Sequence, residues 1–198
     1  MRITGGAAGG RLLKVPKGLD VRPTPDLVKQ AIFNSLGPVV AGARVLELFA
    51  GSGALGLECL SRGAVDVTAV ELSSRHANFI RGNVRQAGLD SARFSLRVQD
   101  VFVALGQLTE AGDTFDLILA DPPFGPKTHG TRSESLSQKL LDDPRLPGLL
   151  VTGGIVVLGH AARDQVEVPP DWEERKRMRH GDSVMRFLLR PQAPVGPS

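Results

Sequence analysis

The sequence is poor in cysteine, in long apolar runs and in the marks of an export signal. Among its 198 residues Cys59 is the single cysteine, which excludes a disulfide framework and fits a reducing cytoplasm. No apolar stretch approaches the roughly 20 residues of a membrane-spanning helix, and the opening MRITGGAAGG lacks the apolar region of a signal peptide. We therefore expect a cytoplasmic protein that does not enter a membrane.

Histidines are also few, and their positions argue against a metal centre. None of the four stands at the spacing typical of metal ligands. We expect no bound metal, and we expect each histidine on the surface or in a turn. They are His76, His129, His160 and His180.

Charge is distributed unevenly along a chain of otherwise ordinary composition. Apolar residues make up 41% and charged residues 23%, and the length suits one α/β domain with small additions. Residues 1–38 hold six Lys/Arg against two acidic residues, and residues 171–198 hold six against four. The stretch 39–170 holds twelve against fifteen. Basic ends around an acidic middle favour a polyanionic partner, with ordinary solvated surface charge as the alternative.

A glycine-rich turn follows the first apolar run, within RVLELFAGSGALG at residues 44–56. Gly51, Gly53 and Gly56 have the spacing G-x-G-x-x-G, which is typical of a strand–loop–helix that holds a nucleotide-type cofactor. A simple chain reversal is the alternative. Glu47 lies inside the strand before this loop. A carboxylate there disfavours a phosphate and favours a cofactor with a cationic sulfonium and an amino acid tail.

Apolar periodicity predicts alternating strands and helices after residue 43, which indicates a mostly parallel sheet. Strands are expected at 45–49, 65–72, 94–98, 115–120 and 154–159, followed by an antiparallel pair at 172–179 and 184–189. Upstream, a hairpin of 2–4 with 11–15 precedes a helix from about 26 to 36 with Leu27, Ala31 and either Leu36 or Ile32 facing inward. The hairpin has few apolar residues, so we expect its basic side chains to be available. This divides the chain into a basic arm at 1–38, an α/β domain at 39–190 and a disordered tail at 191–198.

Four expected strands end with a carboxylate. These residues are Glu47, Glu71, Asp100 and Asp121. Carboxyl ends of parallel strands share one sheet edge, where ligands of α/β proteins bind. Glu71 lies 20 residues after Gly51, a separation suited to a carboxylate that binds ribose hydroxyls, and Asp100 is then placed for an adenine amino group. Both roles fit NAD or S-adenosylmethionine, although Asp100 taken alone is slightly better explained as a helix cap or a solvated turn.

The stretch Asp121-Pro122-Pro123-Phe124 offers acceptors without donors at the end of an apolar strand. Two prolines remove two N–H groups, which leaves a carboxylate, a carbonyl and a flat ring. That combination suits an exocyclic amine on a base that stacks on Phe124. A Pro-Pro loop that merely ends a strand is the alternative.

The motifs ELFAGSGALG, VTAVEL, VQD and LILADPPF resemble, in this order, class I S-adenosylmethionine-dependent methyltransferases that methylate amines. The segments RITGGAAGGRLLKVP, RPTPDLVKQAIFNSL and HGDSVMRFLLR resemble the bacterial RsmD family of 16S ribosomal RNA guanine-N2 methyltransferases. The resemblance implies a Rossmann-like sheet with an antiparallel C-terminal strand and a small N-terminal hairpin and helix. One departure is that the family more usually has an Arg-Glu pair where this chain has Lys29-Gln30.

The resemblance also implies roles for residues at matching positions. S-adenosylmethionine would contact Glu47, Phe49, Ala50, Gly51, Ser52, Gly53, Glu71, Leu72, Asp100 and Val101. The target guanine would lie against Asp121, Pro122, Pro123 and Phe124. The RNA would be held by Arg2, Arg11 and Lys14, with Arg22 and Thr24 bordering the active site. The partner would be 16S ribosomal RNA or the small ribosomal subunit, and the enzyme a monomer.

Three alternatives remain from the sequence. A DNA adenine or cytosine methyltransferase uses the same chemistry, but such enzymes usually need a large target-recognition domain, for which this chain has no large insertion. An NAD-dependent oxidoreductase fits the glycines and Glu71, whereas Glu47 and the DPPF stretch argue against it. A non-catalytic RNA-binding protein with a vestigial fold would not need the intact motifs.

Overall fold

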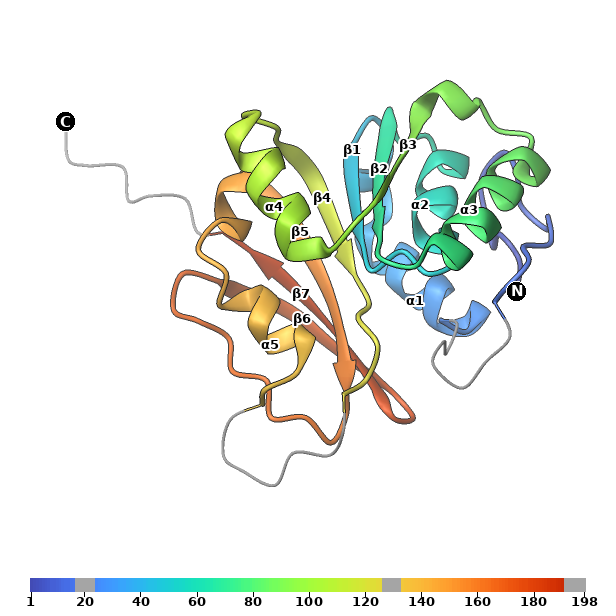
Figure 1. The fold of residues 1–198 in the computed structure, drawn as a ribbon. Helices are drawn as coiled ribbons and strands as arrows, with labels where there is room; N and C mark the ends of the chain where they lie inside the picture. The colour runs from blue at the N-terminus through green and yellow to red at the C-terminus, as the bar shows by residue number, and fades with distance from the viewer. Residues whose placement is uncertain (17–23, 126–132, 191–198) are drawn as a thin grey trace.

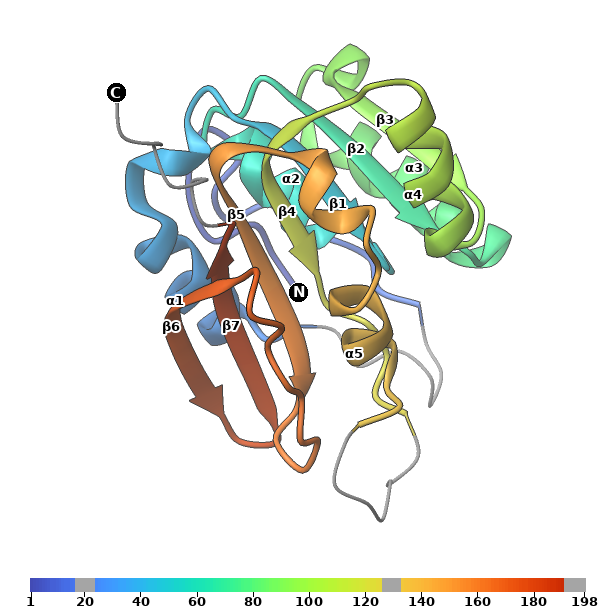
Figure 2. The same cartoon turned by 90° about the vertical axis from the view of Figure 1, so that its left-hand side faces the viewer.

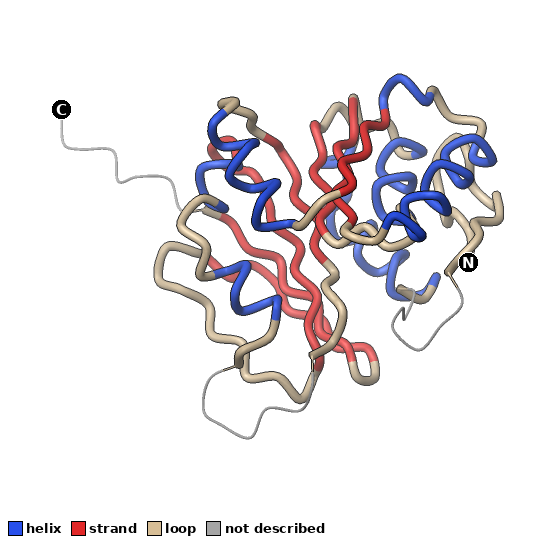
Figure 3. The backbone as a smooth tube through the Cα atoms, in the orientation of Figure 1, coloured by secondary structure: helices blue, strands red, loops and turns tan. Residues whose placement is uncertain are grey.

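A computed structural model describes residues 1–16, 24–125 and 133–190, and its core is a single seven-stranded sheet (Figures 1 and 3). The strand order is β3-β2-β1-β4-β5-β7-β6. The first five strands pair in parallel, and β7 is antiparallel to both β5 and β6. The bounds are β1 Arg44–Leu48, β2 Asp66–Glu71, β3 Phe94–Val98, β4 Phe115–Ala120, β5 Leu150–Ala161, β6 Glu173–His180 and β7 Ser183–Leu189. The expected fold class is confirmed.

Helices cover both faces of this sheet and make a three-layer structure (Figures 1 and 2). On one face α1, Asp26–Leu36, and α2, Ala54–Ser61, pack on strand residues such as Val45 and Leu117, and α3, Ser74–Ala87, packs through Ile80. On the other face lie α4, Val101–Glu110, α5, Leu136–Leu141, and the short 3-10 helix Leu146–Leu149. Two further 3-10 turns are Gly37–Val40 and Ser91–Arg93. No helix in the described part of the chain is long and apolar enough to cross a bilayer.

The helix ends follow from local chemistry. Ser73 accepts a hydrogen bond from the His76 N–H and begins α3, and Gly88 ends this helix in a left-handed conformation with φ of 62°. Asp100 caps α4 in the same way through the N–H groups of Phe102 and Val103. The cap at Asp100 is the one that the sequence analysis considered for this residue, because caps depend on residues close together in the chain.

Residues 1–16, the first part of the N-terminal arm, pack against the domain more closely than the sequence suggested. Its hairpin has one antiparallel bridge, Arg2 with Leu12, and its loop bonds to the end of α2, where Ala8 N–H donates to Ser61 Oγ at 2.9 Å. Ile3 and Leu13 are buried and pack with Leu57 of α2. The arm therefore buries three apolar residues, Ile3, Ala8 and Leu13, whereas Arg2, Arg11 and Lys14 remain exposed.

Two further expectations about burial need correction. Leu27 is 68% exposed, and the inward face of α1 instead includes Lys29, whose side chain is fully buried. His160 is not at the surface but lies buried in β5, where its Nε2 accepts a hydrogen bond from Arg186 Nε at 3.1 Å. Burial lowers the pKa of His160, so this histidine favours the neutral form that accepts the bond. The expected tail at 191–198 and His129 lie outside the described residues.

Candidate active site

The candidate site lies where the direction of strand order reverses. Strand β1 has β2 and β3 on one side and β4 and β5 on the other, so the carboxyl ends of β1 and β4 form the switch point at which α/β sheets bind ligands. Glu47 of β1 pairs in register with Leu119 of β4, and Asp121 follows β4 directly. The topology thus brings the expected cofactor residue and the expected catalytic residue to adjacent strand ends.

The loop after β1 has the geometry that its glycines predict. Gly51 and Gly53 have φ values of 56° and 73°, and Phe49 shares this left-handed region with a φ of 58°. Ala50, Ser52 and Gly53 are buried, and α2 begins directly after them. A side chain at Gly56 would lie 2.6 Å from Glu47 Oε2, so glycine leaves room for the carboxylate beneath the first turn of α2.

Glu47 is the most unusual ionisable group at this edge. It is 2% exposed, and its Oε1 accepts a hydrogen bond from Leu55 N–H at 3.2 Å. Its Oε2 has no hydrogen-bond partner among the described residues. Burial, with a contribution from the charges of Glu71 and Asp121, raises the pKa of Glu47 to about 8, although N–H groups at the start of α2 oppose this. Such an oxygen is well suited to a cationic or hydrogen-bond-donating ligand.

Glu71 holds the neighbouring loop together. Its Oε2 accepts from Gly51 N–H at 2.7 Å, and its Oε1 accepts from Ser73 N–H at 2.8 Å. His76 Nδ1 lies 3.3 Å from the same Oε1, a partner that the sequence analysis did not identify. Next to this carboxylate Leu72 is 67% exposed, so an apolar surface lies open beside the expected ribose site.

Asp100 lies at the end of the next strand and serves first as a cap. Its Oδ1 accepts from Phe102 N–H at 2.8 Å and from Val103 N–H at 3.2 Å, while Oδ2 takes no part in these bonds. Val101 is buried behind it. Both explanations of Asp100 therefore remain compatible, since a capping carboxylate still has an oxygen for a second partner.

Asp121 is half-buried and is held from two sides. Thr24 Oγ1 donates a 2.7 Å hydrogen bond to Oδ2, and a Cβ at Gly159 of β5 would lie 2.3 Å from Oδ1. Burial raises the pKa of Asp121, and the bond from Thr24 lowers it. Pro122 is buried beside Asp121, whereas Pro123 is exposed.

The remaining part of this stretch stays accessible. Phe124 is half-buried, and Gly125 carbonyl accepts a hydrogen bond from Arg163 at 2.8 Å. Asp121 and Phe124 are thus both partly exposed within one stretch of four residues, which is compatible with a stacked base that carries an amine.

The expected RNA contacts are spread along the arm. Arg2 has a side chain that is 60% exposed and lies 3.3 Å from Asp26, and Arg11 donates to the carbonyl of Gln86 at the end of α3. Lys14 is exposed, Thr24 contacts Asp121, and Arg22 lies outside the described residues.

Two buried polar side chains outside the expected site connect the arm to it. Asn83 of α3 accepts from Lys14 N–H and donates to the carbonyls of Lys14 and Ser52, at 2.8, 2.8 and 2.9 Å. Lys29 of α1 donates to the Arg2 carbonyl and lies 3.8 Å from the buried carboxylate of Glu58 on α2. Both partners are distant in sequence, so no local pattern indicates either connection.

The residues at this edge fit S-adenosylmethionine. The unpartnered Glu47 oxygen suits a positively charged group, the glycine loop allows close approach, and exposed Leu72 offers an apolar surface to a base. Among the described residues no group of three or more His, Cys, Asp or Glu could hold a metal ion.

Comparisons with known proteins agree with this geometry. A family model described as "Conserved hypothetical protein 95" matches residues 1–189. Ribosomal RNA small subunit methyltransferase D of Escherichia coli K12 is 31% identical over 191 residues, covering 96% of this chain and 90% of that protein.

Two solved structures share the fold. The putative methyltransferase yhhF from Escherichia coli superposes with a TM-score of 0.75 at 30% identity, covering 96% of this chain and 97% of the other. A putative methyltransferase complexed with SAH, SMU.776, has a TM-score of 0.65 at 17% identity, covering 85% of this chain and 50% of its own. The expectation of a methyltransferase is confirmed. The chain belongs to the family of ribosomal RNA small subunit methyltransferase D.

Proposed function

We propose that this protein transfers a methyl group from S-adenosylmethionine to the exocyclic N2 amine of a guanine in 16S ribosomal RNA. The observation that carries the proposal is the Asp121 carboxylate at the end of β4. It is followed by Pro122 and Pro123, which have no N–H to donate, and then by the aromatic residue Phe124. A relative 31% identical over nearly the whole chain is named for small-subunit ribosomal RNA, which supports this class of substrate.

S-adenosylmethionine supplies an electrophilic methyl group on its sulfonium. Asp121 would hold the guanine N2 toward this methyl group, and the products would be the N2-methylated guanine and S-adenosylhomocysteine, with the displaced N2 proton released to water. Asp121 accepts a hydrogen bond from the amine, orients its lone pair and stabilises the positive charge that grows on nitrogen. Positioning of the two reactants supplies the main rate enhancement, a contribution of up to roughly 7 to 11 kcal/mol.

Cofactor residues keep the roles set out above. Glu47 and the loop Phe49, Ala50, Gly51, Ser52 and Gly53 hold the methionine part, Glu71 and Leu72 the ribose side, and Asp100 with Val101 the adenine. The guanine leaves its stack to reach Asp121, since a stacked base cannot present its amine there. Arg2, Arg11 and Lys14 hold backbone phosphates, with Arg22 and Thr24 at the entrance.

The substrate also sets the proposed setting of the enzyme. The enzyme acts as a monomer without a metal on 16S ribosomal RNA or the small subunit. It acts in the cytoplasm, because ribosomal RNA is made and assembled in that compartment. Within the chain, residues 1–38 form the RNA-contacting arm and residues 39–190 the catalytic domain.

A methyl-transfer assay with nucleoside analysis tests the reaction. Radiolabelled S-adenosylmethionine is offered with free 16S ribosomal RNA, with small subunits and with duplex DNA. Label in N2-methylguanosine from the ribosomal samples is the expected result. Label confined to amines of DNA bases would instead support the DNA methyltransferase alternative.

Substitution of Asp121 separates catalysis from cofactor binding. Asp121→Ala should abolish turnover and leave the dissociation constant for S-adenosylmethionine nearly unchanged. Asp121→Asn, which keeps one acceptor oxygen and adds a donor, serves as the matched variant and should retain little activity. A large loss of cofactor affinity in either variant would contradict the proposed role of Asp121.

A further inference from the structure

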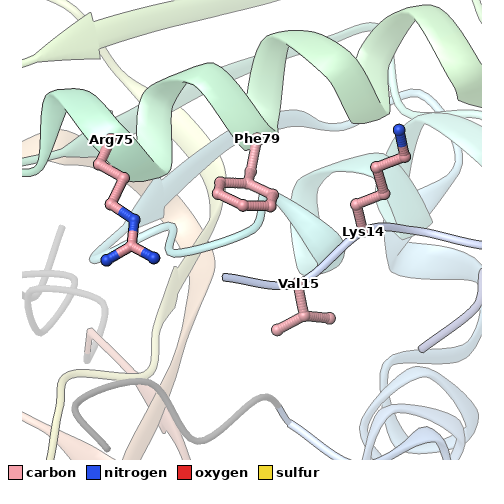
Figure 4. A pocket seen from close by; sticks show the side chains of 4 residues that line it. All are labelled: Lys14, Val15, Arg75 and Phe79. Atoms are coloured by element: carbon pink, nitrogen blue, oxygen red, sulfur yellow. The ribbon is translucent and has the colours of Figure 1, made fainter. Parts of the chain in front are cut away.

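An open pocket separates the N-terminal arm from helix α3, apart from the Asp121 site. It has a volume of about 420 Å³ and is lined by Lys14, Val15, Arg75 and Phe79 (Figure 4). Figure 4 shows Arg75 and Phe79 extending from α3 toward the side on which the arm passes with Lys14 and Val15. This volume is within the range of small-ligand sites in proteins.

Both walls of this pocket are held in place. Arg75, Phe79 and Asn83 follow one another at intervals of four residues, so they share one face of α3. Fully buried Asn83 bonds to the N–H and the carbonyl of Lys14, both at 2.8 Å, and to the carbonyl of Ser52 in the glycine loop at 2.9 Å. The pocket is therefore built on the same rigid support as the cofactor loop.

The lining has the chemistry of a nucleotide-binding surface. Arg75 and Lys14 are exposed and cationic, and no lining residue is acidic. Phe79 is half-buried, and it forms part of the pocket wall. An aromatic ring between cations is the arrangement with which proteins stack a base and hold its phosphates.

We propose that this pocket binds a nucleotide of the RNA substrate other than the target guanine, a proposal that rests on the proposed RNA substrate. Its base stacks on Phe79 beside Val15, and its flanking phosphates contact Arg75 and Lys14. The target guanine occupies the Asp121 site, so the pocket holds the strand at a second point. Asn83 then transmits the position of the bound strand to the cofactor loop through Ser52.

Equilibrium binding of a short fluorescent oligouridine to the full chain tests the pocket. Phe79→Leu keeps an apolar side chain but removes the flat ring, and it should raise the dissociation constant about tenfold. Arg75→Gln should weaken binding and lower the salt slope by about one. The matched control is Arg81→Gln, an exposed arginine on another face of α3, which should change the affinity little.

Two further measurements show whether a change in oligouridine affinity comes from unfolding or from a change at the cofactor site. Thermal unfolding verifies that each variant is folded, and calorimetry with S-adenosylmethionine should give the same affinity as the unsubstituted protein. If Phe79→Leu binds the oligouridine as tightly as the unsubstituted protein, the pocket does not stack a base. If the same variant loses cofactor affinity by the same factor, the pocket belongs to the cofactor site, and the proposal is overturned.

The proposal for the pocket and the proposed reaction can fail independently of each other in these experiments. Phe79→Leu could lose oligouridine binding while the unsubstituted enzyme forms no N2-methylguanosine. The proposal for the pocket would then stand, and the proposed reaction would be refuted. Normal N2-methylguanosine formation with an unchanged KM for RNA in Phe79→Leu would refute the pocket alone.

Discussion

Thr24 Oγ1 donates a 2.7 Å hydrogen bond to Oδ2 of Asp121, a residue 97 positions later in the chain. This bond joins the segment before α1 to the end of β4, so the N-terminal region contributes directly to the candidate catalytic site. It also stabilises the ionised carboxylate, since it lowers a pKa that burial raises.

Removal of this hydroxyl should change the pH dependence of methyl transfer. In Thr24→Val the pKa of Asp121 rises further, so the acid limb of the kcat profile should move to higher pH. Thr24→Ser retains the donor and should keep the profile of the unsubstituted enzyme. The check is kcat across the acidic range for all three proteins, and coincident acid limbs would contradict the role of this bond.

Gly159→Ala should reduce turnover by displacing the Asp121 carboxylate. The added Cβ would lie 2.3 Å from Asp121 Oδ1, so the side chain must move. Misplacement by about 1 Å can lower a rate by about 100-fold. Single-turnover methyl transfer measures the effect, with cofactor affinity expected to remain.

The control for that substitution is Gly148→Ala, because a Cβ at Gly148 meets nothing within 4 Å. Equal rates in the two alanine variants would show that the space beside Asp121 is not needed.

Glu47→Gln should alter how stability depends on pH in the cofactor-free protein. The pKa of Glu47 is about 8 in the folded chain against 4.5 for a solvated glutamate, so the folded state binds an extra proton between these values. The stability that this provides is complete below the unfolded-state pKa and is lost as pH rises toward 8, by up to about 1.4 kcal/mol per pH unit. Urea unfolding across this range should show a flatter dependence in Glu47→Gln, and identical slopes would contradict the buried carboxylate.

Lys29→Met should destabilise the fold and loosen the arm. It removes the cation beside fully buried Glu58 and the donor to the Arg2 carbonyl. Breaking one side of a buried pair costs about 3 to 5 kcal/mol. Urea unfolding provides the measurement.

The double variant Lys29→Met with Glu58→Gln tests whether the pair is the cause. Glu58 also bonds to Thr4 and Arg62, so recovery should be partial. Strictly additive losses would show that the two side chains do not interact.

Local patterns predicted the strands better than they predicted burial. The bounds of β3 and β4 match the expectation because each apolar run is set off by polar or turn-forming residues. The burial of Lys29 could not be predicted in this way, since two of the partners that make it tolerable, Glu58 on another helix and the Arg2 carbonyl, are distant in sequence. Leu27 was placed inside for the same reason, because the pattern alone excluded a lysine from the inward face.

In the candidate site, too, residues in local sequence patterns could be predicted, whereas residues that depend on tertiary packing could not. Glycine spacing and the DPPF stretch mark residues that the sheet brings to one edge, and those were found from the sequence. Asn83 and His76 act through partners supplied by tertiary packing, at Lys14, Ser52 and Glu71. Neither has a sequence pattern of its own that could have revealed it.

The loop at residues 5–8 of the arm predicts which of its residues related proteins should retain. Ser61 bonds to backbone atoms of Gly5, Ala7 and Ala8, and a Cβ at Gly6 would lie 1.9 Å from its carbonyl oxygen. Backbone contacts tolerate changes in the side chains that surround them. Lineages that diverge in the rest of this loop should therefore still retain glycine at position 6 and a small hydroxyl residue at position 61.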